Sequence, residues 1–453
     1  MSYWKLKVEN FGKIKHAEIE LAPMTLFVGD NNSGKSYLLS LVWAIYGLSG
    51  RTVFSYGAIS NFDSEEYRAI EAVLLEAIDQ LSCDGNVMVN VQNISKLVEK
   101  IINQLMERYK DQFVKKIFNC ELVEVSRISL TMPEHVPGNI IFTRSQSNLI
   151  FQCMNTQKVY LGFWDNDSDQ LQKRRSAVKA FVADLICNLI GTADVDQNPS
   201  DKGMVYLPSA RTGFMMTKDI INKFARRNTY DIGLESTDRV QIQPFSQPII
   251  DFLDELNDLS DEENTVEDYQ KISSFLQQYM IQGKIVMSHL PGKELAYMPE
   301  GQSKKYPFRA TSAVVTELSP LFLLLAHKRK LSGIFYEEPE MCLHPSLQRR
   351  MGQVLIKMVH AGINVTATTH SDIILQHINN MIRLQNSGKN PEDYGYDNSD
   401  FLSEKQVRVY QLSNCTDGMT EVKELHGSEK GFAVPTFNDA LDDLMDEVIQ
   451  IQE

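Results

Sequence analysis

A glycine-rich loop constrains this chain more than any other feature of its sequence. Residues 29–36 read GDNNSGKS and match G-x-x-x-x-G-K-[S/T] at each fixed position. An apolar segment, 24–28, predicts a buried strand before the loop, and the mostly apolar segment 37–48 predicts a buried helix after it. When such a loop connects a strand to a helix, the backbone N–H groups of the loop and the N-terminus of the helix point at the same bound anion. The sequence therefore predicts a site for a nucleoside triphosphate.

Side chains of the loop have separate predicted roles. We expect Lys35 to reach the β- and γ-phosphates and Ser36 to offer its hydroxyl to Mg²⁺. The other expected nucleotide contacts come from the loop and the first helical turn: Asn31, Asn32, Ser33, Gly34 and Tyr37. A glycine turn that happens to contain Lys-Ser is the alternative, and the flanking strand and helix argue against it.

Composition predicts an ordinary globular protein in a reducing compartment. The apolar share is 43% and the charged share 23%, as in typical globular domains. The N-terminus lacks the apolar core of a signal peptide, and the longest apolar run, 321–326, is too short to cross a bilayer. Six scattered cysteines without C-x-x-C spacing predict free thiols. We therefore expect a cytoplasmic protein with no membrane partner.

Charge argues against nucleic-acid binding over the whole surface, because the formal net charge is −14. Basic residues gather locally, and we interpret most of these clusters as solvated faces. They lie at 173–175, 226–227, 304–305 and 328–330. Because of these local clusters, direct DNA binding remains one of the alternatives.

The hydrophobic patterns along the chain alternate between strand and helix periods. The expected elements are a hairpin over 4–8 and 16–21, helices over 63–118, a β region over 122–163, a helix over 176–191, a strand over 204–208, a polar helical insertion over 212–274 and an antiparallel pair over 284–298. Acidic residues 261–264 within the insertion cannot belong to a core. The sequence has no sustained heptad repeat, so it does not predict a long coiled coil.

A second apolar strand, 334–340, ends in acidic residues. We expect it to lie beside the phosphate-loop strand, with Glu337 holding Mg²⁺ and Glu338 orienting or deprotonating the attacking water. Because aspartate is usual at the metal position, the longer Glu337 can act through a water molecule. An ordinary strand end with exposed acids is the alternative.

A third strand, 362–371, ends in Thr-His-Ser. Its spacing from Glu338 suits one intervening helix and a parallel neighbouring strand. His370 at that strand end can donate a hydrogen bond to a γ-phosphate. A lone histidine is more often structural, but the spacing favours the functional interpretation.

The order of these motifs resembles that of ABC-type ATPases, and more narrowly their SMC-like and OLD-like (overcoming-lysogenisation-defect) branch. The resemblance rests on the phosphate loop, the acidic strand end with its Pro-Glu, His344-Pro345 and the Thr-Thr-His-Ser strand end. The opening segment 8–14 and the segment 206–211 also resemble that branch. The likeness covers mainly residues 1–50 and 305–385.

This resemblance implies a composite site, in which two ATP molecules are held between two heads. Each ATP is held by one phosphate loop and by a serine-led signature of the other head, which here would be Ser312 acting in trans. Ala313 departs from the usual glycine, so hydrolysis or dimer closure is expected to be slow. Pro320 would bend the following helix or mark its first turn. Arg211 falls where the family places its Q-loop, which links nucleotide to the inserted lobe.

The fold class implied is α/β, a P-loop ABC/SMC-type ATPase head with an antiparallel β lobe and an inserted helical subdomain. We expect these segments: 1–50, N-terminal part of the head; 51–203, mixed lobe; 204–213, Q-loop-like strand end; 214–283, acidic helical insertion; 284–385, C-terminal part of the head; 386–453, C-terminal extension. The long gap between loop and acidic strand must hold inserted lobes.

Family likeness implies an ATP- and Mg²⁺-dependent switch that forms homo-oligomers. The segment after His370 has no convincing nuclease constellation, and its acids resemble one face of an amphipathic helix: Asp439, Asp442, Asp443 and Asp446. We therefore expect a bacterial antiphage ATPase that controls a separate effector, such as a Toprim or HNH nuclease. A DNA repair ATPase that clamps DNA is the alternative. A transporter subunit is disfavoured by the long inserted lobe.

Overall fold

The structure is a computed structural model that divides the chain into two compact units. It describes residues 4–48, 53–81, 85–136, 138–153, 156–161, 163–164, 170–190, 203–218, 221, 245–287, 295–434 and 445–451. The first unit contains Met1–Leu21, Ser40–Lys202 and Cys415–Val422, and the second contains Ala22–Leu39, Gly203–Asn414 and Lys423–Glu453. The phosphate loop and the acidic strand end both belong to the second unit.

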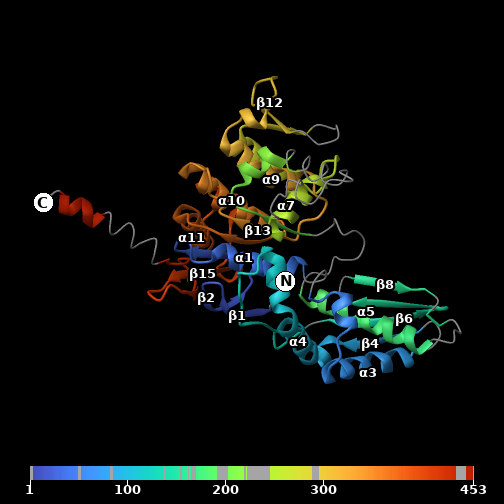
Figure 1. Ribbon diagram of the computed structural model, residues 1–453. Coiled ribbons are helices and arrows are strands. Elements are labelled where there is room, and N and C mark those ends of the chain that lie inside the picture. The colour runs from blue at the N-terminus through green and yellow to red at the C-terminus, as the bar shows by residue number, and fades with distance from the viewer. Residues whose placement is uncertain are drawn as a thin grey trace, which may run out of the picture. The chain divides into compact units, whose positions relative to one another are not determined.

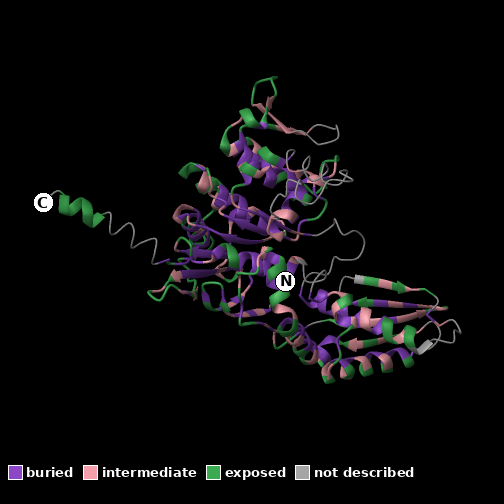
Figure 2. Cartoon of the chain, in the orientation of Figure 1, coloured by how far each residue is buried: buried purple, intermediate pink, exposed green. Residues whose placement is uncertain are grey.

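Five parallel strands form the centre of the second unit (Figure 1). Their spatial order is β15 (Val407–Asn414), β3 (Met24–Gly29), β14 (Asn364–Thr368), β13 (Gly333–Glu337) and β9 (Met204–Leu207). Every residue of β3 and β13 is buried (Figure 2). Strands buried on both faces are the pattern of parallel sheets covered by helices, so the mixed α/β fold expected from the sequence is confirmed.

The order of these strands corrects one expectation. The acidic strand β13 does not pair with the phosphate-loop strand β3, because β14 lies between them and is parallel to both. Between two parallel strands, a crossover helix carries the chain back to the edge of the sheet at which the strands begin. The next strand can therefore lie between two strands that come earlier in the chain. Thr368 of β14 is level with Phe27 of β3 and with Glu337 of β13. The carboxyl ends of all three strands therefore meet at one edge.

Helices and a small sheet complete the second unit. The helices are α7 (Gln247–Asn257), α8 (Glu267–Leu276), α9 (Ala313–His327), α10 (Pro345–His360) and α11 (Asp372–Asn386), with π-helical η3 (Gln277–Ile281) and 3-10 turns η4 (Phe308–Ala310), η5 (Pro391–Tyr394), η6 (Asn398–Asp400) and η7 (Glu404–Gln406). Residues 211–218 are also helical. The sheet contains β10 (Gly283–Met287), β11 (Leu295–Pro299) and β12 (Tyr306–Pro307), and β10 pairs with β11 antiparallel as expected.

In its described residues, 211–218 and 245–283, the acidic insertion is largely helical, and its acids differ in exposure. Residues 261–263 are exposed, whereas Asp251 and Glu255 of α7 are buried. Glu255 forms an ion pair of 2.5 Å with Lys328, so this member of the basic cluster 328–330 is not on a solvated face. Residues 288–294, within the expected antiparallel pair, lie outside the described residues.

The first unit is mainly antiparallel. One group of strands has the order β5 (Arg127–Thr131), β1 (Lys5–Phe11), β2 (Ile14–Glu20) and β16 (Thr420–Leu425), and a second sheet has the order β4 (Asn86–Asn90), β6 (Asn139–Ser145), β7 (Asn148–Cys153) and β8 (Thr156–Tyr160). Its helices include α2 (Tyr56–Ser60), α3 (Glu65–Asp79), α4 (Val91–Phe118) and α5 (Gln170–Ile190). The hairpin and the β region expected from the sequence are confirmed.

The expectation that the segment 63–118 is helical is wrong in the middle. Strand β4 interrupts it and pairs antiparallel with β6. Its alternation of exposed and partly buried residues has the period of a strand. Asn90 then ends the strand and caps α4 by accepting from the N–H of Gln92. Among the described residues, no helix is both long and apolar enough to span a membrane.

Candidate functional site

The phosphate loop connects β3 to α1 (Lys35–Trp43), which continues as π-helical η1 (Ala44–Leu48). Gly29 has φ +120°, and a Cβ there would lie 2.1 Å from the carbonyl oxygen of Leu412 in β15. Gly34 has φ +90°, and Asn32 has φ +56°. Left-handed backbone at these positions explains why the loop needs glycine at its two fixed places. The helix begins at Lys35, so its N-terminus faces the loop.

Lys35 reaches into the loop. Its Nζ donates to the carbonyl oxygens of Gly29 at 3.0 Å and Asp30 at 2.5 Å. Burial lowers the pKa of Lys35 to about 8, although the nearby charges of Glu338, Asp30 and Glu340 oppose this shift. The ammonium group therefore lies within the cradle where a phosphate would take over from the carbonyl oxygens as its partner.

The other loop side chains divide by exposure. Asn31, Asn32 and Ser36 are exposed, and Tyr37 is 45% exposed. Ser33 is buried and its hydroxyl donates to the carbonyl oxygen of Asp30 at 2.8 Å, so it braces the loop from inside. The side chains of Asn31, Asn32 and Ser36 are therefore accessible from solvent.

A tether from β15 holds the loop, and local sequence patterns do not reveal it. The carboxylate of Asp30 accepts from the N–H of Asn414 at 2.8 Å. The side-chain amide of Asn414 donates to the carbonyl oxygen of Asn31 at 3.1 Å. Two loop residues are thus tied to the end of a strand that comes almost four hundred residues later in the chain.

Glu337 ends β13 and faces β9. Its carboxylate accepts a hydrogen bond from the hydroxyl of Tyr206 and another from the N–H of Ser209 at 3.1 Å. The side chain is buried. Both of its oxygens therefore have donors from the end of β9, and a direct bond to Mg²⁺ would compete with the Tyr206 hydroxyl. The metal role of Glu337 stays a prediction.

Glu338 has a constrained backbone. Its φ is +42°, in the left-handed region that non-glycine residues seldom adopt. Its N–H donates to the carbonyl oxygen of Thr368 at 3.0 Å, which fixes it to the end of β14. Its charge raises the pKa of Lys35, so the carboxylate and the loop ammonium act on each other. Such strain is typical of functional positions.

A third acid, Glu340, holds the segment that carries His370. One of its carboxylate oxygens accepts from the N–H of His370 at 2.6 Å and the other from the hydroxyl of Thr369 at 2.9 Å. Burial raises the pKa of Glu340. Burial first, and then the charge of Lys35, lower the pKa of His370. We did not predict a role for Glu340 from the sequence, although it lies two residues after Glu338 in the same motif.

His344 and Pro345 of the same motif start α10. His344 is the N-cap residue, and its ring nitrogen accepts from the N–H of Ser346, while Pro345 occupies the first helical turn. This is the usual position for proline in a helix. These residues therefore shape the chain after the acids.

Arg211 lies behind the acidic strand end and is fully buried. Its guanidinium donates to the carbonyl oxygens of Glu337 at 2.5 Å and Glu338 at 2.9 Å, and it forms an ion pair of 2.5 Å with Glu317. Sequence reasoning placed Arg211 at a link between nucleotide and lobe. The partners on β13 and α9 come only from the tertiary structure.

Ser312 precedes α9 as its N-cap residue. It and Ala313 are exposed, and the Ser312 side chain does not cap the helix. The hydroxyl therefore sits at a helix N-terminus that a second molecule can approach, as the prediction of a contact in trans requires. Pro320 lies inside α9, which begins at Ala313, so it does not mark the first turn.

A family comparison decides what kind of protein this site belongs to. The model of the AAA ATPase domain family matches residues 1–375. The chain belongs to this family. The matched span includes every site residue expected from the sequence, from Asn31 to His370, and the chain is accordingly an AAA-family ATPase. No curated protein matches it in sequence.

Solved structures with similar folds include SMC heads. An SMC head domain from Thermotoga maritima is 11% identical, with 93% of this chain and 98% of that chain covered and a TM-score of 0.33. An Smc head domain with an extended coiled coil, bound to the C-terminal domain of ScpA derived from Pyrococcus furiosus, is 12% identical, with 100% of both chains covered and a TM-score of 0.36. An Smc head bound to the C-winged helix domain of ScpA is also 12% identical, with 93% and 97% covered and a TM-score of 0.36.

The AAA ATPase loop fits a triphosphate. A close-approach glycine, left-handed backbone, an exposed helix N-terminus and a buried ammonium converge on one cradle. For Mg²⁺ the donors at hand are the exposed hydroxyl of Ser36 and, if released by Tyr206, the carboxylate of Glu337. In the described part of the chain, no three His, Cys, Asp or Glu side chains gather as a metal site. Mg²⁺ commonly takes few protein ligands and shares substrate phosphates.

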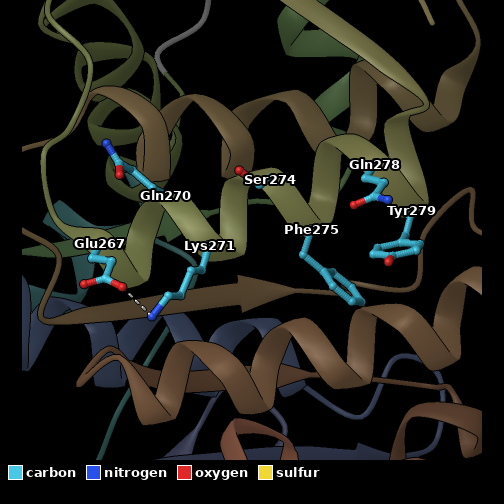
Figure 3. Close-up of a pocket in the computed structure, with 7 residues that line it drawn as sticks. All are labelled: Glu267, Gln270, Lys271, Ser274, Phe275, Gln278 and Tyr279. Atoms are coloured by element: carbon cyan, nitrogen blue, oxygen red, sulfur yellow. Dashed lines mark ion pairs between the residues drawn. The ribbon is translucent and has the colours of Figure 1, made fainter. Parts of the chain in front are cut away.

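A separate pocket of about 370 Å³ lies along α8 (Figure 3). The rings of Phe275 and Tyr279 lie 4.9 Å apart in it, and the guanidinium carbon of Arg350 lies 5.2 Å from the Tyr279 ring centre. Its lining residues are Glu267, Gln270, Lys271, Ser274, Phe275, Gln278 and Tyr279. None of these residues belongs to the phosphate loop or to the strand ends, so this pocket is not part of the nucleotide site.

Proposed function

We propose that this AAA ATPase is a switch of a bacterial antiphage defence system. Two copies would close on ATP and Mg²⁺, and this assembly state would hold or release a separate effector, such as a Toprim or HNH nuclease. Hydrolysis would return the copies to the open state. The alternative is a DNA repair or recombination ATPase that clamps DNA.

One observation carries the nucleotide part of this proposal. Lys35, Glu338 and His370 follow β3, β13 and β14, whose carboxyl ends meet at one edge of the sheet. The ammonium would bind the terminal phosphates, the carboxylate would orient or deprotonate the attacking water, and His370 would hydrogen-bond the γ-phosphate. Mg²⁺, when bound, would neutralise phosphate charge. The exposed Ser312 supports completion of the site by a second copy.

The effector part rests on the resemblance of the motifs to the OLD-like branch. ATP-dependent assembly fits that resemblance, because a serine in trans makes each nucleotide site depend on a partner head. Control of an effector then follows if the effector recognises only one assembly state.

Substitution of Glu338 tests the switch directly. We expect Glu338→Gln to keep ATP bound and to stabilise the assembled state, because the carboxylate that orients the water is lost while the cradle is unchanged. Native mass spectrometry with ATP and Mg²⁺, and a phosphate-release assay, measure the two effects. Glu392→Gln, at an exposed position outside the site, is the control. Unchanged assembly and unchanged turnover in Glu338→Gln would contradict the assignment.

Co-expression with neighbouring genes separates the two cellular roles. A stable co-purified effector that changes its association with ATP supports the defence switch. Tight DNA binding by the chain alone, measured by electrophoretic mobility shift with ATP, supports the repair alternative instead.

A further inference from the structure

A buried ion pair connects the acidic strand end to the helix that begins at the proposed signature. Arg211 and Glu317 are 0% and 1% exposed, and the Nη2–Oε1 distance is 2.5 Å. The guanidinium carbon also lies 4.7 Å from the centre of the Tyr336 ring. Because both side chains are buried, removal of either one would leave the other charge without its partner.

On the Arg211 side of the pair, the guanidinium donates hydrogen bonds to backbone carbonyl groups. Nη1 donates to the carbonyl oxygens of Pro208 at 2.7 Å and Glu337 at 2.5 Å, and Nη2 donates to that of Glu338 at 2.9 Å. Two successive carbonyl groups at the end of β13 are therefore held by one planar group. Because Glu338 has φ +42°, these bonds help keep a strained residue in place.

The Glu317 end belongs to α9. Its second carboxylate oxygen accepts from the N–H of Thr212 at 3.0 Å and from its hydroxyl at 2.8 Å. The Thr212 hydroxyl also lies 3.0 Å from that of Thr316. The first turns of α9, directly after the exposed Ser312, are thus fixed to the residues that follow β9.

We propose that Arg211 is a positioning residue that makes the placement of Glu338 depend on the position of α9, and hence on the docking of a second copy at Ser312. This inference rests on the proposed function, since it concerns ATP hydrolysis between two copies. A shift of α9 would move Glu317, and the planar guanidinium would pass that shift to the carbonyl groups it holds. Lysine offers no such planar set of donors.

A second buried ion pair at the other end of α9 provides the control. Lys328, which ends α9, pairs with Glu255 of α7 at 2.5 Å, and their side chains are 6% and 9% exposed. This pair matches Arg211–Glu317 in burial and distance, but it bonds to no carbonyl group of the acidic strand end. Loss of either ion pair removes a buried interaction, but only loss of Arg211–Glu317 should change catalysis.

The experiment compares Arg211→Lys and Glu317→Gln with Glu255→Gln in the full chain. We expect the first two to lower the kcat for ATP by 10- to 100-fold, the range that misplacement of a reacting group produces. Binding of a fluorescent ATP analogue should change less than about threefold, because the loop is untouched. Combining the two variants should cost little more than either alone. Glu255→Gln should lower the unfolding temperature and leave kcat within about twofold.

Three results would overturn the inference while leaving the proposed function in place. One is an equal kcat loss in Glu317→Gln and Glu255→Gln at equal folded fraction. Another is fully multiplicative losses in the double variant. The third is a normal kcat in Arg211→Lys. If Arg211→Lys does not fold, Thr212→Val removes one bond to Glu317 and is compared in the same way. Absence of hydrolysis by the wild-type chain would overturn the proposed function, and this inference with it.

Discussion

The phosphate loop and the acidic strand end lie at the same edge of one sheet, yet they are held in place differently. The loop is shaped chiefly by its own backbone: Gly29 and Gly34 have positive φ, and Lys35 bonds to carbonyl groups of the loop itself. The acidic end depends on distant residues, with Tyr206 and Arg211 both contributing from more than a hundred residues away.

This difference separates binding from hydrolysis. A loop shaped mostly by its own backbone, with one tether from Asn414 at the end of β15, can bind phosphate once β3, β15 and α1 have formed. The acids, in contrast, depend on β9, β14 and α9 for their orientation. We therefore expect substitutions in the loop to abolish nucleotide binding, and substitutions around the acids to change turnover while binding persists.

The largest expected effect breaks the loop. Lys35→Ala removes the ammonium, and hydrogen bonds to charged groups contribute about 1.5–3 kcal/mol each. We therefore expect ATP affinity to fall roughly 100-fold or more. Titration with a fluorescent ATP analogue measures this, with the exposed Lys405→Ala as control. Unchanged affinity would show that the loop does not bind phosphate through this side chain.

The next effect concerns the acidic end. Glu340→Gln places an amide group against one of two donors, the N–H of His370 or the hydroxyl of Thr369. An unsatisfied buried group costs about 1–3 kcal/mol, so turnover should fall about tenfold as His370 shifts. ATP affinity should stay within about threefold in the same titration. A parallel loss of affinity and turnover would mean that Glu340 supports the loop as well.

A smaller effect tests whether the Glu337 carboxylate can bind a metal when its bond to Tyr206 is lost. Tyr206→Phe removes the hydroxyl that donates to its carboxylate, which frees one oxygen for a metal. Because a hydrogen bond contributes about 1 kcal/mol net, the Mg²⁺ concentration for half-maximal ATP turnover should fall roughly fivefold. The exposed Tyr394→Phe is the control. If Mg²⁺ dependence does not change, Glu337 is a structural partner of β9 rather than a metal ligand.

The last prediction concerns α11, where we expect an effect on stability and the smallest effect on nucleotide binding and turnover. Burial, and then the charge of Arg349, lower the pKa of His377 to about 4, against the opposing charge of Asp400. The unfolded chain, with an ordinary pKa near 6.5, binds more protons between these values, so stability is present above about pH 6.5 and is lost as pH falls toward 4. The loss is at most about 3 kcal/mol. His377→Gln should flatten this loss in urea unfolding at about pH 7 and pH 4.5, whereas the exposed His426→Gln should not.

Sequence patterns predicted the strands and helices of the site better than they predicted which strands lie side by side. The strand, loop and helix around residues 24–48 are confirmed, as is the parallel pairing of the strands that precede Glu338 and His370. Adjacency of β13 and β3 was predicted wrongly, because strand spacing along the chain does not reveal which strand enters between two others. The helical period over 63–118 likewise hid the short strand β4.

The sequence by itself determined the phosphate loop, because glycine positions and a helix start act through adjacent residues. It also determined that two further strands end in acids and in histidine. Only the tertiary structure decided that the Glu337 carboxylate bonds to Tyr206, that the charge of Glu338 acts on Lys35, and that Arg211 joins the acidic strand end to Glu317. The partners in these contacts lie roughly a hundred residues or more apart, and no local pattern specifies how long-range partners meet.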